Sequence, residues 1–383
     1  MKRIFVVLAI VVLILLFIFF SIQKEEHVIK LGGLVPLKER YGISVRHGIE
    51  LAVDKVNISG GIQGRKVEVI FKDTQGLPER GIDLVQELID IEKVKAIIGP
   101  VFSRVTLAIS PIVEAKKVPL ISPTSTSPKI TNAGHFIFRN CPSDRLQGKI
   151  LACLAVNEMG LRKIAVYYIL DDYGKGLKDI FSKEVQDLGG EIVESLGFQE
   201  KPNFKEDLKR IKKRKPDSIL ILGYPRELIR ILKEIRGLNL NWKILSADCF
   251  YTKEIIEKAK EATEGVVFTA SYFDPYSKEP VVKKFVEEYE ARFGSLPDMY
   301  AALSYDAANL LISAIKQAKV KGRVIIRNEL SKIENFKGVT GITTFDKNGD
   351  VTKQIGRFMV KNGEFVPYER DLEESVEKEE GTY

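Results

Sequence analysis

The stretch VKAIIGPVFSRVTLAISPIVEAKKVPLISPTSTSP, residues 94–128, contains the pattern from which the fold can be predicted. Residues 94–99 and 118–121 are short apolar runs of the kind found in buried strands. Residues 104–116, which lie between them, have the length of a short helix. A strand, a helix and a second strand at this pitch indicate a helix that crosses over a parallel sheet. The stretch therefore predicts an α/β fold.

The same alternation continues on both sides of this stretch. Towards the N-terminus, strands are predicted at 28–35 and 67–71, and helices at 44–57 and 79–92. Beyond it, helices are predicted at 145–160, 176–188, 204–214 and 226–237, and strands at 164–170, 191–198, 218–223 and 243–248. Two such runs of similar length indicate two doubly wound, Rossmann-like lobes. The remaining elements are a strand at 266–272, helices at 280–293 and 299–318, and a hairpin at 345–351 with Asn348-Gly349 at its turn. They must complete both lobes, so each lobe is expected to be discontinuous in sequence.

The composition excludes several classes of protein. The chain has 383 residues, of which 45% are hydrophobic, and 59 Lys and Arg against 52 Asp and Glu give a net charge of +7. These values exclude a disordered, collagenous or multi-span membrane protein, and the length suits two domains. The basic residues are mixed with acidic ones, and only 209–215 is densely basic, which a solvated helix end explains. No nucleic-acid partner is expected.

The two ends of the chain differ from its body. Residues 4–20 are all apolar and follow Lys2 and Arg3, and a helix over 4–22 reaches about 28 Å, which is close to the thickness of a bilayer core. We predict an uncleaved membrane anchor within residues 1–26, with the rest of the chain outside the cytoplasm. A cleaved signal peptide is the alternative, although 19–23 is a poor cleavage site. The acidic segment 369–383 is predicted to be a disordered tail.

The sequence has no motif for catalysis or for metal binding. The chain lacks GxSxG, GxxxxGK and HExxH, and no GxGxxG follows a predicted strand. The cysteines are Cys141, Cys153 and Cys249, and the histidines are His27, His47 and His135. Their spacing fits no metal site, and the cysteines allow either one disulfide bridge or none. We expect no enzyme activity, no metal and no cofactor.

Small polar residues follow two of the predicted strands. Ser103 stands at the start of a helix after 94–99, and the run 123–128 follows 118–121. In open α/β sheets ligands bind at the carboxyl ends of strands, and a helix N-terminus with nearby hydroxyl groups attracts a carboxylate. Ser103 can equally be a helix cap, and the hydroxyls of 123–128 can simply stabilise a turn. Spacing alone leaves both interpretations open.

Several segments together carry a family resemblance. They are Tyr41-Gly42, NISGGIQGRKVEVIFKDTQ (57–75), AIIGPVFS (96–103), VPLISPTSTSPKIT (118–131), DDYGKGL (171–177), LGYPREL (222–228) and YDAANLL (305–311). With these segments the chain resembles the extracytoplasmic solute-binding proteins for leucine, isoleucine and valine, which have the type I periplasmic-binding fold. The resemblance implies two lobes joined by three crossovers, with the ligand in the cleft. The implied lobes are 27–142 with 275–343, and 143–274 with 344–368.

The resemblance also implies a set of ligand-binding residues. Ser103 and Thr126 would hold the carboxylate of an amino acid, and the backbone carbonyl of Thr124 would accept from its ammonium group. Tyr224 and Asp248 would contact the ammonium group from the second lobe. The side-chain end of the pocket would be lined by Tyr41, Phe102, Tyr173 and Tyr300. Each residue also has a purely structural interpretation, as a core aromatic, a loop residue or a cap.

Two departures from the family pattern leave the identity of the ligand open. The usual disulfide of the family would join positions near Gln75 and Phe102, and neither residue is Cys. The acidic position reads Ala-Asp-Cys at 247–249 instead of Pro-Glu-Gly, so its carboxylate is one carbon shorter.

The function that the resemblance implies is capture of an amino acid by hinge closure and its delivery to the permease subunits of an ABC importer. A membrane-tethered receptor that senses an amide, an aromatic acid or another small carboxylate is the alternative. An enzyme on a similar scaffold is a third hypothesis, which the missing catalytic motifs disfavour.

Overall fold

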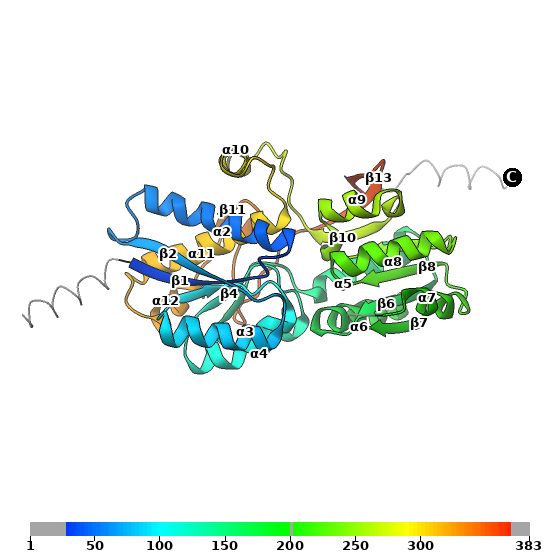
Figure 1. Cartoon of the computed structure of the whole chain (residues 1–383), viewed down its shortest axis with the longest axis horizontal. Coiled ribbons are helices and arrows are strands. Elements are labelled where there is room, and N and C mark those ends of the chain that lie inside the picture. The colour runs from blue at the N-terminus through cyan, green and yellow to red at the C-terminus, as the bar shows by residue number, and fades with distance from the viewer. Residues whose placement is uncertain (1–27, 200–201, 369–383) are drawn as a thin grey trace, which may run out of the picture.

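The structure, a computed structural model, describes residues 28–199 and 202–368. The predicted anchor and the predicted acidic tail lie outside these residues. Within them, no helix combines the length and the apolar character that a membrane crossing needs. The chain forms two lobes that lie next to each other, each built on its own sheet (Figure 1).

The first lobe is built on a five-stranded parallel sheet with the order β2-β1-β3-β4-β5. Its strands are β1 (Val28–Val35), β2 (Lys66–Asp73), β3 (Ala96–Ile98), β4 (Leu120–Ser122) and β5 (Ile137–Arg139). The parallel sheet that residues 94–128 predict is therefore confirmed. The strand β5 was not predicted, because its sequence Ile-Phe-Arg ends in a charged residue and lies between His135 and Asn140, so it forms no apolar run like those of β3 and β4.

Helices cover both faces of this sheet. The helices of this lobe are α2 (Arg40–Ile58), α3 (Pro78–Gln86), α4 (Ser103–Ala115), α10 (Pro280–Phe293), α11 (Met299–Gln317) and α12 (Arg323–Leu330), of which α10 packs against α2. The helices α2 and α11 pack together on one face, and α3 and α4 pack together on the other (Figure 1). Because α11 comes from late in the chain and is buried along most of its length, the core of the first lobe joins distant parts of the sequence.

The second lobe is built on a seven-stranded mixed sheet with the order β14-β13-β10-β9-β8-β6-β7. Its strands are β6 (Lys163–Ile169), β7 (Glu191–Phe198), β8 (Ser218–Leu222), β9 (Lys243–Ser246), β10 (Val267–Ser271), β13 (Ile355–Lys361) and β14 (Glu364–Pro367). Its helices are α5 (Asp144–Cys153), α6 (Asp172–Asp187), α7 (Phe204–Lys212), α8 (Pro225–Gly237) and α9 (Lys253–Ala259). The strands β6 to β10 are parallel, whereas β13 and β14 form an antiparallel hairpin on the edge of β10.

Short elements complete the described chain. The π-helical turns η1 (Glu87–Ile91) and η3 (Leu154–Glu158) extend α3 and α5. The 3-10 turns are η2 (Pro128–Asn132), η4 (Asp248–Phe250) and η5 (Lys260–Thr263). A separate two-stranded ribbon consists of β11 (Phe336–Gly338) and β12 (Gly341–Thr343). Residues 345 and 351 form an isolated antiparallel bridge around the predicted turn.

The described chain passes between the two lobes at three places. The connections lie between β5 and α5, between β10 and α10, and between β12 and β13. Each lobe therefore contains segments from both the early and the late part of the chain. The exact residue limits given above for the two lobes stay a prediction.

Two predicted helix starts were wrong in a way that affects the site. The helix predicted at 44–57 begins at Arg40, so Tyr41 lies in the first turn of α2. The helix predicted at 176–188 begins at Asp172, so Tyr173 lies in the first turn of α6. The carboxylate of Asp171 accepts a hydrogen bond from the backbone N–H of Gly174 at 2.9 Å and caps the helix. The two glycines in this turn have low helix propensity, which explains why the pattern placed the start too late.

Candidate functional site

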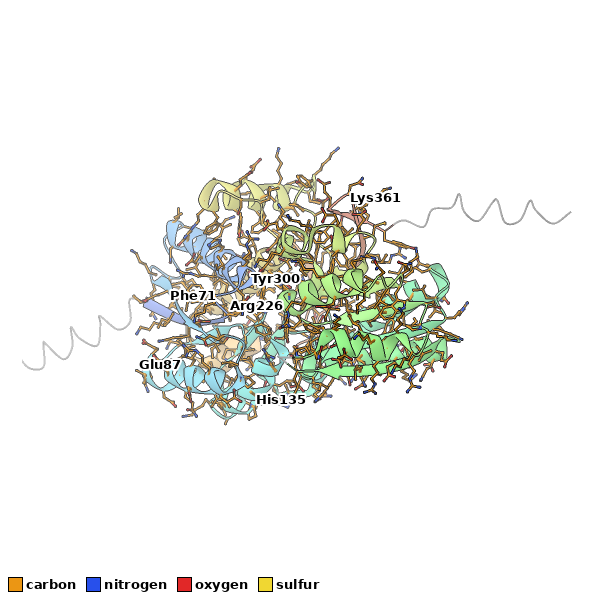
Figure 2. The ribbon with its side chains drawn as sticks, turned by 45° about the vertical axis from the view of Figure 1, so that its right-hand side comes forward. Phe71, Glu87, His135, Arg226, Tyr300 and Lys361 are labelled. Atoms are coloured by element: carbon orange, nitrogen blue, oxygen red, sulfur yellow. The ribbon has the colours of Figure 1, made fainter. Side chains whose placement is uncertain are left out.

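A cavity lies between the lobes, and residues of both lobes line it. The lining residues are Tyr41, Val101, Phe102, Ser103, Thr124, Thr126, Tyr173, Tyr224, Pro225, Asp248, Cys249 and Tyr300. All nine residues that the sequence analysis selected are among them, so the structure brings the whole set together. Figure 2 labels Tyr300 on α11 and Arg226 on α8, which lie at the junction of the lobes, close to this cavity.

The wall formed by the first lobe presents hydroxyl groups and a helix N-terminus. Ser103 is the first residue of α4 and is 2% exposed, and its Oγ accepts a hydrogen bond from the backbone N–H of Ser127 at 3.2 Å. The first N–H groups of a helix have no partner within it and carry partial positive charge. This wall can therefore hold a carboxylate without a charged side chain.

The loop that carries Thr124 and Thr126 is held from behind. The guanidinium of the buried Arg139 donates through Nη1 to the backbone carbonyls of Thr126 and Ser127, at 3.0 Å each. Its Nη2 forms an ion pair with Asp350 at 2.7 Å. The hydroxyl of Thr124 donates to the carbonyl of Val101 at 3.1 Å. These bonds fix the loop, so its polar groups are positioned before any ligand arrives.

The opposite wall presents a carboxylate. Asp248 begins the η4 turn that follows β9, and its Oδ1 accepts from the Tyr173 hydroxyl at 2.9 Å and from Gln147 Nε2 at 3.4 Å. Burial raises the pKa of Asp248 to about 6, although the hydrogen bonds from Tyr173 and Gln147 oppose the rise. An ammonium group placed in the cavity would stabilise the ionised form of this carboxylate.

Aromatic rings connect the two walls. Consecutive ring centroids are 5.5 Å apart for Tyr300 and Tyr41, 6.0 Å for Tyr41 and Phe102, 4.6 Å for Phe102 and Tyr224, and 5.8 Å for Tyr224 and Tyr173. Burial raises the pKa of all four tyrosine hydroxyls, so they remain protonated donors at neutral pH. The row of rings gives the cavity an apolar side suited to an apolar ligand side chain.

Two carboxylates near the cavity were not selected from the sequence. The Tyr224 hydroxyl donates to Asp171 Oδ2 at 2.6 Å, so Asp171 holds a cavity residue in place. The sequence feature that could have indicated Asp171 is its position three residues before Gly174, where an Asp side chain can cap the N-terminus of a helix.

Asp144 is the second of these carboxylates, and it is fully buried. Within the described chain no group makes a hydrogen bond of regular geometry with either of its carboxylate oxygens, although the Thr126 hydroxyl lies beside it. Burial raises the pKa of Asp144 well above its usual range, and the nearby charge of Asp248 raises it further. Asp144 opens α5 just after the first connection between the lobes, where no periodic pattern points to it.

The three cysteines, all of which lie in the described chain, form no disulfide bridge and belong to no metal site. Cys141, Cys153 and Cys249 are all free, which decides between the two alternatives that their number left open. Burial raises the pKa of the Cys249 thiol, so this group faces the cavity in its neutral form. Among residues 28–199 and 202–368, no cluster of His, Cys, Asp or Glu has the arrangement of a metal site.

Comparisons with known proteins identify the family to which this fold belongs. The model of the periplasmic binding protein family matches residues 28–364. A crystal structure of the leucine-binding protein LivK from Thermotoga maritima superposes with a TM-score of 0.83 at 34% identity, covering 89% of this chain and 98% of that one.

Two further solved structures were determined with a ligand bound. The branched-chain amino acid binding protein LivJ from Streptococcus pneumoniae, in complex with isoleucine, has a TM-score of 0.82 at 29% identity and covers 88% of this chain and 97% of that one. An ABC-transporter solute-binding protein from Rhodopseudomonas palustris, in complex with 3,4-dihydroxybenzoic acid, has a TM-score of 0.80 at 25% identity, covering 89% and 96%. The family consists of solute-binding proteins and is not a class of enzymes. The chain therefore belongs to the periplasmic binding protein family, and within it to the type I proteins of the branched-chain amino-acid kind.

Proposed function

We propose that the protein is the extracytoplasmic substrate-binding component of an ABC importer and that it captures an apolar, branched-chain or similar amino acid. The observation that carries this proposal is the polarity of the cavity. One wall offers hydroxyls and a helix N-terminus, the opposite wall offers the Asp248 carboxylate, and aromatic rings lie between them. A zwitterion with an apolar side chain complements all three features.

Each part of an amino acid has its own binding residues in this proposal. The carboxylate lies at Ser103 and Thr126 and accepts from their hydroxyls and from the N-terminus of α4. The ammonium donates to Asp248 and to the Thr124 carbonyl, with Tyr224 beside it. The side chain lies among Tyr41, Phe102 and Tyr300, with Tyr173 closing the second-lobe end of the aromatic row.

Closure of the two lobes is the step that commits the ligand. The carboxylate residues and the Thr124 carbonyl lie on the first lobe, whereas Tyr224 and Asp248 lie on the second, so only the closed form gives the ammonium group its charged partner. A ligand shifts an equilibrium by its differential affinity for the two states, and here the contacts with the second lobe supply that difference. The permease subunits of the importer then recognise the closed form. Residues 4–22 anchor the protein to the membrane in this proposal.

The test is calorimetric titration of the purified protein with the twenty amino acids, short aliphatic acids, amides and aromatic acids. We expect binding of leucine, isoleucine or valine, and much weaker binding of the same molecules without the amino group. Binding of a sugar or a nucleobase alone would overturn the amino-acid assignment.

An aromatic acid is the second candidate ligand. The row of five aromatic rings and the relative solved with 3,4-dihydroxybenzoic acid favour it. An aromatic acid has a carboxylate for the first wall but no ammonium for Asp248. Substitution of Asp248 by Asn would therefore leave the affinity for an aromatic acid unchanged or raise it, whereas it would lower the affinity for an amino acid.

A further inference from the structure

Arg104 occupies the rim of the cavity without lining it. It follows Ser103 in the first turn of α4, and its side chain is 20% exposed. The guanidinium carbon lies 5.2 Å from the ring centroid of Phe102, on the same lobe, and 5.3 Å from that of Tyr224, on the other lobe. Its Nη1 lies 3.5 Å from Asp171 Oδ2, also on the second lobe. One side chain therefore contacts both lobes at the mouth of the cavity.

The first lobe holds this side chain by itself. Arg104 Nε donates to the carbonyl of Gly76 at 2.7 Å, and the guanidinium lies over the Phe102 ring. A Cβ at position 76 would come within 2.8 Å of that ring and 3.2 Å of Arg104 Nη2, and the φ of Gly76 is +71°. Glycine at this position therefore allows the ring and the guanidinium to pack against the backbone. None of these contacts requires the second lobe.

The second lobe holds the opposing groups in the same way. Asp171 Oδ1 accepts from the backbone N–H of Gly174 at 2.9 Å, and Oδ2 accepts from the Tyr224 hydroxyl at 2.6 Å. The Asp171 side chain is 8% exposed, so its charge is less screened by water than that of a surface residue. These bonds lie within the second lobe and fix the carboxylate and the Tyr224 ring as one surface.

We propose that Arg104 is a positioning residue that latches the closed cleft and prolongs the residence time of the ligand without touching it. Each half of the latch is organised on its own lobe, so closure adds an ion pair and a cation–π contact at little cost in side-chain entropy. This inference rests on the proposed function and specifies how closure is stabilised.

A second pair between the lobes provides a matched control. Arg226 forms an ion pair with Glu39 at 2.6 Å, and its side chain is 69% exposed. Exposed ion pairs contribute little because water and salt screen them. Both arginines thus bridge the lobes, but only Arg104 does so in a partly buried, aromatic environment.

The experiment measures the association and dissociation rates of L-isoleucine by stopped-flow fluorescence for the wild type, Arg104→Met, Arg104→Lys and Arg226→Met. We expect Arg104→Met to dissociate about tenfold faster with an association rate within about twofold of the wild type. Arg104→Lys should be intermediate, because lysine keeps the charge but not the planar fork. Arg226→Met should dissociate like the wild type. Equal dissociation rates for Arg104→Met and the wild type, or an effect confined to association, would overturn the proposal.

A second measurement separates failure of the latch from failure of the proposed function. Small-angle X-ray scattering of the unliganded proteins should show a more open average shape for Arg104→Met and for Asp171→Asn than for the wild type. This comparison applies even if calorimetry finds no isoleucine binding, a result that would refute the proposed ligand alone. Identical scattering profiles for all three proteins would refute the latch. Asp171→Asn keeps one carbonyl oxygen that accepts from Gly174, and its amide nitrogen can donate to the Tyr224 hydroxyl, so it tests the ion pair if Arg104→Met does not fold.

Discussion

The two walls of the cavity solve the same problem, binding of a charged group, by different means. The first wall has no ionisable side chain among its hydroxyl and backbone groups, and its attraction for an anion comes from the N-terminus of α4 and from a loop fixed by Arg139. The second wall relies on the carboxylate of Asp248, whose pKa is raised by burial. Binding at the first wall should therefore be nearly independent of pH, whereas binding at the second should depend on one proton. The following experiments test this contrast.

The largest effect is expected for Asp248→Ala. Loss of one partner of a buried charge pair costs about 2–5 kcal/mol, so the affinity for an amino acid should fall by that amount in calorimetric titration. Asp187→Ala, an exposed carboxylate on the second lobe, is the control and should bind like the wild type. An unchanged affinity for Asp248→Ala would remove this residue from the site.

Ser103→Ala tests the first wall. A hydrogen bond to a charged group contributes about 1.5–3 kcal/mol, and the N-terminus of α4 remains in the variant, so we expect a loss near the lower end of that range. The loss should be the same at pH 5 and pH 8, because the serine does not titrate. Calorimetry at both pH values checks this, and a loss that varies with pH would contradict the proposed division between the walls.

The pH dependence of the wild type tests the second wall. An ammonium ligand requires ionised Asp248, and protonation of this group below about pH 6 competes with the ligand. The dissociation constant should therefore rise about tenfold for each unit of pH below 6 and stay nearly constant from pH 7 to 8.

The free energy of unfolding of the unliganded protein should have the opposite pH dependence to that of the ligand affinity: it should fall, and not rise, as the pH increases towards 6. A carboxyl whose folded pKa is raised loses stabilising free energy as the pH rises from its unfolded pKa of about 4 towards 6. Calorimetric titrations with ligand and unfolding measurements without it, made across this pH range in the wild type and in Asp248→Asn, separate the two effects. The variant should lack the effect on binding and show a smaller effect on stability, because burial also raises the pKa of Asp144.

The smallest effect is expected for Tyr224→Phe. This change removes the hydroxyl that donates to Asp171 but keeps the ring that packs on Phe102. The hydroxyl bonds to Asp171 within the second lobe and not to the ligand, so its loss should affect binding only indirectly and lower the affinity by about 1 kcal/mol or less. Tyr224→Ala should cost clearly more, because the ring is lost as well. Equal losses for the two variants would mean that the ring contributes nothing to binding.

The fold was largely predictable from the sequence because the central strands of both sheets, such as β3, β4, β8 and β10, are fully buried and are short, largely apolar runs. The strands over 28–35, 191–198 and 218–222 were predicted within one residue. The antiparallel hairpin of β13 and β14 was missed, since it lies at the edge of the sheet, β13 alternates buried with less buried residues and is not a continuous apolar run, and β14 has only four residues. The start of α6 was misplaced because a cap, and not periodicity, determines where that helix begins.

The site was predictable only where the family resemblance supplied it. Spacing alone left Ser103 and the loop 123–128 undecided between a binding role and a structural one, and the structure places both at the cavity. Asp144 and Arg104 had no signal in the sequence. Their positions depend on how the two lobes meet, and an interface between lobes is a property of three-dimensional structure that no local pattern encodes. The contacts of Asp144 and Arg104 can be recognised only in the folded structure, where residues from distant segments lie together.

The packing of α2 against α11 has a consequence for how the chain acquires its structure during synthesis. The helix α2 buries its apolar face on α11, although residues 59–298 separate the two helices in sequence. The parallel strands of the second lobe, from β6 to β10, lie within one continuous segment and can pair as soon as that segment has emerged. The first lobe must leave apolar surface uncovered until nearly the whole chain has been made. We expect it to fold last, and its exposed helix α2 to be the part of the nascent protein that most needs protection from aggregation.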